Sequence, residues 1–142
     1  MHPIGVIRRG EQSFVRDRLG SLGLMPVDAF CLRMINKLGE CNQDALCTRM
    51  EIDKGRVAKL LAGLEARGLI QRTINEKNKR EKRVVLTDQG RETLALVNQT
   101  MDEWNEIGLS GFTEEERAQY FSYLSRIADN VNRFRKEGWP RG

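Results

Sequence analysis

The segment from Asp53 to Leu86 reads DKGRVAKLLAGLEARGLIQRTINEKNKREKRVVL, and it decides the fold. Its first half predicts a helix that is capped by Asp53 and ends at Gly68. The core-facing stripe of this helix has the spacing i, i+3, i+4, i+7 and consists of Val57, Leu60, Leu61 and Leu64. The opposite face is almost bare of bulky side chains. Such a slim face suits a helix that enters a groove, and a surface helix of small residues is the alternative.

The second half of the segment predicts a hairpin. Residues 69–74 and 83–86 are rich in apolar and β-branched side chains, which indicates two short strands. A basic tongue of about eight residues connects them. Residues 75–83 contain two anions and five cations, namely Lys77, Lys79, Arg80, Lys82 and Arg83. We expect the tongue to be the protruding loop of the hairpin, although a solvated charged surface is the alternative.

Three helices are expected upstream of this segment. The first covers about residues 4–19, and the second begins at Pro26 and ends at Gly39. The third follows an Asn42 N-cap and precedes the capped helix directly. Two short helices followed by a hairpin form a winged helix-turn-helix, whose second helix enters the major groove of DNA. The predicted fold class is therefore mainly α with a small β-hairpin wing.

Two long helices are expected downstream. Thr87 is the predicted N-cap of one, and Thr113 with Glu116 forms a capping box for the other. The last helix carries a heptad-like apolar seam of Tyr120, Leu124, Ile127, Val131 and Phe134. These helices share no obvious core with the winged unit. Their apolar seams can pack on the chain's own first helix or on a second copy of the chain. We expect that they pack on a second copy.

Composition excludes several classes of protein. Residues 49–83 hold eleven cations and five anions, whereas residues 86–126 hold three cations and eight anions, so the basic middle suits a nucleic-acid partner. No apolar run approaches the roughly 20 residues that span a bilayer, and no signal peptide is evident, so a cytoplasmic location is expected. The single histidine, His2, argues against histidine catalysis and a histidine-rich metal site. We therefore expect that the protein is not an enzyme and that it binds no cofactor.

The sequence resembles the MarR family of dimeric winged-helix transcriptional regulators. Residues 42–72 resemble the family's helix-turn-helix, residues 78–90 its wing, and residues 111–131 its dimerisation helix. The resemblance implies one MarR-like domain over 1–142, a DNA-binding unit at 26–86, and dimerisation helices at 4–20 and 88–137. It implies a homodimeric regulator, expected to be a repressor, on a pseudo-palindromic duplex site. The alternative is a winged-helix adaptor that binds protein without a DNA role.

The resemblance also implies the site residues. Arg80 matches the family's wing arginine, and Asn78 stands where the family usually has an acid. The DNA-binding residues implied by the resemblance are Gln43, Lys54, Arg56, Lys59, Lys79 and Arg80. The charge of the tongue adds Lys77 and Lys82, which we expect to approach phosphates together with Lys79. Family members often bind small aromatic or phenolic effectors between the dimer helices and the DNA-binding unit.

A candidate effector pocket consists of Phe14, Arg18, Phe30 and Met34. The alternative is that the three apolar side chains are ordinary core and that Arg18 is solvated. Some relatives sense peroxide through a cysteine on the first helix, and this chain has none there. Cys31, Cys41 and Cys47 are therefore expected to be inert thiols. The clustered histidines and carboxylates of zinc-sensing relatives are missing from the sequence, so no metal site is expected.

Overall fold

A computed structural model of the protein describes residues 2–141, and it describes the side chains of all of these except Lys79 and Arg80. The chain divides into two compact units, Met1–Trp104 and Asn105–Gly142. In chain order the elements of the first unit are α1 (Pro3–Leu19), η1 (Gly20–Leu22), α2 (Pro26–Leu38), β1 (Cys41–Asn42), α3 (Gln43–Met50), α4 (Lys54–Ala66), β2 (Ile70–Asn75), β3 (Asn78–Leu86) and most of α5 (Asp88–Gly108). The second unit contains the end of α5 and α6 (Glu114–Glu137).

Local capping explains where the helices of the helix-turn-helix begin. The Asn42 side chain accepts the Ala45 amide at 2.7 Å and caps α3. The Asp53 carboxylate accepts the Arg56 amide at 2.9 Å and caps α4. Both caps satisfy backbone donors that have no partner inside the helix. The two N-caps expected from the sequence are confirmed.

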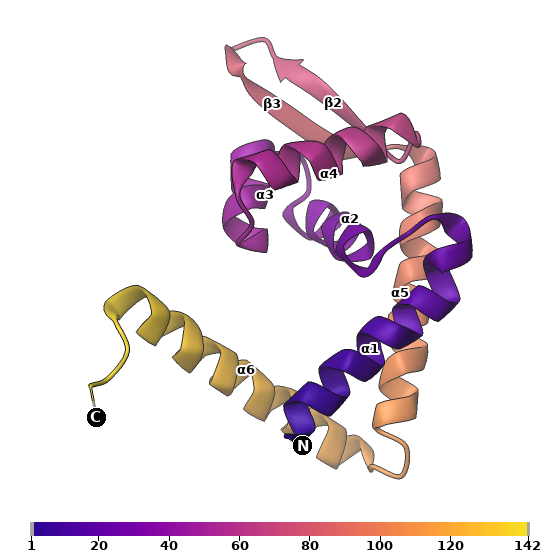
Figure 1. Ribbon diagram of the computed structural model, residues 1–142, viewed down its shortest axis with the longest axis vertical. Helices are drawn as coiled ribbons and strands as arrows, with labels where there is room; N and C mark the ends of the chain where they lie inside the picture. The colour runs from indigo at the N-terminus through magenta and orange to yellow at the C-terminus, as the bar shows by residue number, and fades with distance from the viewer. Residues whose placement is uncertain (1, 142) are drawn as a thin grey trace. The chain divides into compact units, whose positions relative to one another are not determined.

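The three strands form an antiparallel sheet in the order β1-β3-β2. Ile70 pairs with Leu86 and Ile74 with Lys82, so the ladder runs well into the basic segment. The prediction of an eight-residue loop was therefore wrong. The tongue is mainly strand, and the chain turns back at Glu76 and Lys77. Figure 1 shows the resulting hairpin extending past α3 and α4.

One hydrophobic core unites the helices of the first unit. It contains Val15 and Leu19 from α1, the Val57, Leu61 and Leu64 stripe of α4, and Leu94 and Val97 from α5. The expectation that the downstream helices share no core with the winged unit was wrong for this part of α5. Its apolar stripe repeats at helical spacing and so packs against the same buried side chains.

The second unit contains a capped helix whose apolar seam is exposed at Leu124, Ile127 and Val131 and half-buried at Tyr120 and Phe134. Thr113 Oγ1 accepts the Glu116 amide at 3.1 Å and Glu116 Oε1 accepts the Thr113 amide at 2.9 Å, which confirms the capping box. Arg117 Nη1 lies 2.6 Å from Glu106 Oε1, and this ion pair joins the start of α6 to the end of α5. No residue of α6 is buried. Within residues 2–141, no helix has the length and apolar character needed to cross a membrane.

Candidate nucleic-acid interface

The outer face of α4 is slim and basic. Val57, Leu61 and Leu64 turn inward, whereas Arg56 and Lys59 are exposed. The rest of the outer face consists of Lys54, Gly55, Ala62, Gly63 and Ala66, all exposed. A Cβ added to Gly63 would meet no atom within 4 Å, so nothing in the chain crowds that part of the helix. This face combines positive charge with the small side chains that allow close approach to a groove.

Lys54 has one weak tie to the neighbouring helix. Its Nζ lies 3.7 Å from Asp44 Oδ1, and the Lys54 side chain is 82% exposed. A pair this open to solvent contributes between about 0 and 1 kcal/mol. Lys54 can therefore leave Asp44 for a phosphate at little cost.

Gln43 lies at the start of α3, beside the wing. It is half-buried, and its Oε1 is shielded from solvent with no hydrogen-bond partner within the described part of the chain. It helps to line a groove of about 480 Å³ whose other lining residues are Asn42, Asp44, Asn78, Glu81 and Lys82. The structure thus places Gln43 and Lys82 along one groove between α3 and the hairpin.

The hairpin supplies further cations. Lys77 occupies the turn, Lys82 follows on β3, and both are exposed. The expected contacts of Lys79 and Arg80 lie outside the described side chains. Arg72 on β2 is paired with Glu65 of α4, with Nη2 and Oε1 3.0 Å apart. This bond fixes the base of the hairpin to the recognition helix, and it was not expected from the sequence.

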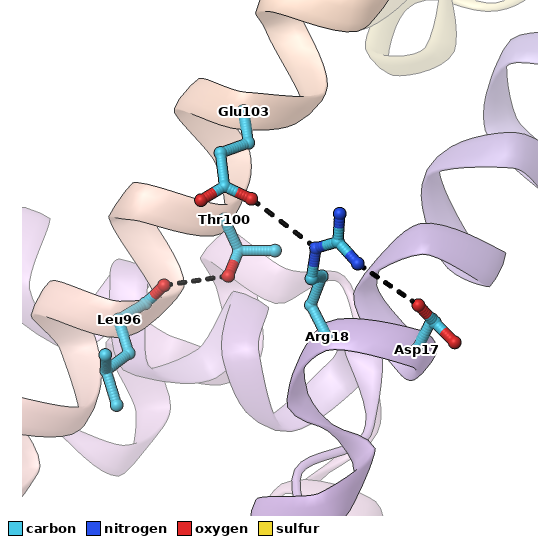
Figure 2. Close-up of polar contacts among 5 residues, drawn as sticks. All are labelled: Asp17, Arg18, Leu96, Thr100 and Glu103. Atoms are coloured by element: carbon cyan, nitrogen blue, oxygen red, sulfur yellow. Dashed lines mark hydrogen bonds and ion pairs between the residues drawn. The ribbon is translucent and has the colours of Figure 1, made fainter.

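The four candidate effector residues fall into two groups. On α1, the Phe14 ring lies 5.7 Å from the Trp104 ring, and the Arg18 guanidinium lies 4.7 Å from the centre of the Phe14 ring. Arg18 Nε is 3.5 Å from Glu103 Oε2, and Figure 2 shows Arg18 between Asp17 and Glu103. This group joins α1 to α5.

The second group, Phe30 and Met34, lines a separate cavity of about 330 Å³. The other residues that line it are Arg33, Asn36, Lys37, Leu94 and Asn98. Among the described residues, therefore, Phe14 and Arg18 do not line the cavity that contains Phe30 and Met34. Phe30 is 40% exposed, so it is not an ordinary core residue.

The cysteines and acidic side chains form no recognisable reactive centre in the described residues. Cys31 and Cys41 are buried, Cys47 is half-buried, and all three are free. Burial raises the pKa of the Cys31 thiol to about 12, with further contributions from nearby Asp28 and Cys41. Burial also raises the pKa of Cys41. No group of three or more potential metal ligands occurs within the part of the chain that is described.

A helix-turn-helix with a basic recognition face and a projecting hairpin defines the class of winged-helix DNA-binding proteins. Residues 24–82 match the MarR family. The HTH-type transcriptional repressor MdtR of Bacillus subtilis is 31% identical over 124 residues, which cover 84% of this chain and 77% of that protein. The HTH-type transcriptional regulator YybA of the same species is 28% identical over 133 residues, with coverages of 94% and 89%.

A solved structure extends the similarity to the whole fold. It is a putative MarR family transcriptional regulator from Listeria monocytogenes in complex with a 26mer DNA. The two folds superimpose with a TM-score of 0.84 and 27% identity, over 98% of this chain and 95% of that chain. The chain belongs to the MarR family, and it is a transcriptional regulator rather than an enzyme.

Proposed function

We propose that the protein is a homodimeric repressor that binds a pseudo-palindromic site in duplex DNA. The observation that carries this proposal is the combination, within one unit, of the slim face of α4 and the cations of the projecting hairpin. In this arrangement α4 enters the major groove and the hairpin follows the adjacent backbone or minor groove. The similarity to MdtR supports repression as the outcome.

Different cations contact different parts of the DNA. Arg56 and Lys59 lie on the face that meets base edges, where a bidentate arginine–guanine contact discriminates between bases. Lys77 and Lys82 approach phosphates, which add affinity without sequence choice. From the sequence alone, Arg80 is assigned to the minor groove and Lys79 to phosphate. Gln43 and Lys54 complete the surface at the starts of α3 and α4.

The exposed apolar side chains support a dimer. On α6, Phe121, Leu124, Ile127 and Val131 are each more than 40% exposed. Helical spacing puts them on one stripe, which is costly to leave in water. Two copies that bury this stripe would present two α4 helices to one face of the duplex, about one helical turn apart.

The cavity beside Phe30 and Met34 supports an aromatic acid as the releasing ligand. Its walls combine apolar surface with the cations Arg33 and Lys37. Such a ligand must have a higher affinity for the conformation that does not bind DNA than for the conformation that does. Equal affinity for both would leave their populations unchanged. A DNA target and free thiols also fit the expected cytoplasmic location.

The test is a selection of duplex sites by the wild-type protein and by Arg56→Ala and Lys82→Ala, followed by binding at several salt concentrations. Arg56→Ala should cost about 1–3 kcal/mol and relax preference at one base pair. Lys82→Ala should weaken all sites similarly and reduce the salt slope by about one. Arg141→Ala removes an exposed cation beyond the end of α6, so it is the control and should change neither quantity.

A clear negative result is available. If the wild-type protein shows no salt-sensitive binding to any duplex, the DNA-binding proposal fails and the adaptor alternative gains support. If all variants select the same sites with the same affinity, the basic face is only solvated surface.

A further inference from the structure

Glu81 is an anion within the basic strand of the wing, and both of its carboxylate oxygens are engaged. Oε1 accepts the side-chain amide of Asn42 at 2.9 Å, and Oε2 accepts the side-chain amide of Asn75 at 2.8 Å. The two partners come from different elements: Asn42 precedes α3 and Asn75 ends β2. A single carboxylate therefore bridges the helix-turn-helix and the hairpin.

Each partner has a second structural task. Asn42 Oδ1 caps α3 through the Ala45 amide, so the Glu81 bond fixes the orientation of the capping side chain. Asn75 Oδ1 accepts the Lys77 amide at 3.0 Å inside the hairpin turn. The regular ladder between β2 and β3 is interrupted between Ile74 and Asn75, just where this bond is made. Glu81 thus supports the hairpin where its backbone pairing is irregular.

The charge of Glu81 opposes DNA binding, because an anion near the phosphates repels them. The hydrogen bonds from Asn42 and Asn75, with the nearby charge of Arg83, hold the pKa of Glu81 below its ordinary value. The side chain is therefore ionised at neutral pH. A role in positioning explains why a negative charge lies on this surface.

We propose that Glu81 is a positioning residue that holds the wing against the start of α3, so that the wing cations and the α3 N-terminus meet one stretch of DNA backbone. This inference rests on the proposed DNA contacts of the wing. It makes a prediction opposite in sign to simple electrostatics, in which loss of any anion from the surface tightens binding.

The test compares Glu81→Gln with Glu76→Gln. Each substitution removes one negative charge from the same hairpin. Glu76 is exposed in the turn and makes no hydrogen bond or ion pair with the side chains that the structure describes, so its substitution reports charge alone. Glutamine at 81 has one acceptor oxygen, and its amide group would face a second amide donor. At least one of the two bridging bonds is therefore lost.

Glu76→Gln should bind a selected duplex as tightly as the wild type or more tightly. Glu81→Gln should bind about tenfold more weakly despite the same gain in charge, when measured at a temperature at which both variants are fully folded. Asn75→Ala should also weaken binding, and the Glu81→Gln/Asn75→Ala double variant should lose less than the two single losses combined. Equal or tighter binding by Glu81→Gln, or full additivity with Asn75→Ala, would overturn the proposal.

A second measurement does not depend on DNA. Hydrogen exchange of the free protein should be faster in Glu81→Gln at the amides of Ala45 and Lys77, which the bridged asparagines hold. Unchanged exchange at both amides would overturn the positioning role even if wild-type DNA binding were absent. If the wild-type protein does not bind DNA but exchange is faster in Glu81→Gln, the structural bridge is supported. Its role in DNA binding is then rejected, together with the proposed function.

Discussion

Arg67 Nη2, at the end of the recognition helix α4, lies 3.3 Å from Oδ2 of Asp28 in the first turn of α2. Asp28 is only 7% exposed, and the same oxygen accepts the Met25 amide at 2.9 Å. Arg67 also donates to the carbonyl of Gly23. These bonds fasten the end of α4 to the connection between α1 and α2, so the position of the recognition helix depends on an ion pair whose carboxylate is buried and whose guanidinium is partly exposed.

Removal of this arginine should be costly. Arg67→Ala leaves the Asp28 carboxylate buried with one backbone donor, so we expect a loss of about 1–3 kcal/mol in the free energy of unfolding. Urea unfolding at a fixed protein concentration measures it. Arg91→Ala is the control, because Arg91 pairs with Asp88, whose side chain is 95% exposed, and should cost about 1 kcal/mol or less. Equal losses would contradict a special role for Arg67.

Two glycines should respond in opposite directions to alanine. A Cβ at Gly90 would lie 1.9 Å from the Leu69 carbonyl oxygen, which is backbone and has little room to move. Gly90→Ala should therefore destabilise the fold by about 1–3 kcal/mol or more. Gly63→Ala meets open space within α4 and should stabilise it by up to about 1 kcal/mol. Thermal unfolding measures both changes, and a loss of stability in Gly63→Ala would show that this face is less open than described.

The free energy of unfolding should decrease at acid pH, because the fold lowers the pKa of at least two glutamates. The Arg72 side-chain hydrogen bond lowers the pKa of Glu65, and the Asn42 bond lowers that of Glu81. Because the unfolded chain binds these protons more readily, the stability that they contribute is present above the ordinary glutamate pKa of about 4.3 and is lost as pH falls through the lower folded values. Urea midpoints should therefore fall as the pH drops below about 4.3. Glu65→Gln should flatten that drop, and an unchanged pH dependence would contradict the assignment.

The three thiols should differ in reactivity. Cys31 is fully buried and its pKa is raised to about 12, whereas Cys47 is half-buried. Because the thiolate is the reactive species, iodoacetamide at pH 8 should label Cys47 before Cys31 in the folded protein. Mass spectrometry of peptides over time measures the order. Labelling of Cys31 as fast as Cys47 would show that the core opens readily.

The α6 seam should decide the oligomeric state. Leu124→Asp with Ile127→Asp puts two charges on the exposed apolar stripe and should produce monomer or aggregate, as measured by analytical ultracentrifugation. Gln119→Asp with Ser122→Asp is the matched control, since helical spacing puts these residues on the other face of α6. A wild-type monomer at micromolar concentration would exclude the dimer proposed here.

The sequence alone determined the features that depend on near neighbours. The Asn42, Asp53 and Thr113 caps were predictable because each joins a side chain to an amide three residues ahead. The buried stripe of α4 was predictable because helical periodicity puts its leucines on one face. The order of these elements was sufficient to indicate the winged-helix class.

Only the tertiary structure decided the features that join distant parts of the chain. The tongue became strand because β3 pairs along its length with β2, and cross-strand pairing outweighed the polar character of the segment. Arg67 meets Asp28 from 39 positions away, and Glu81 meets Asn42 from the same separation. No local pattern of charge identifies such partners, because many chain arrangements satisfy the same local preferences and only packing of the shared core selects one.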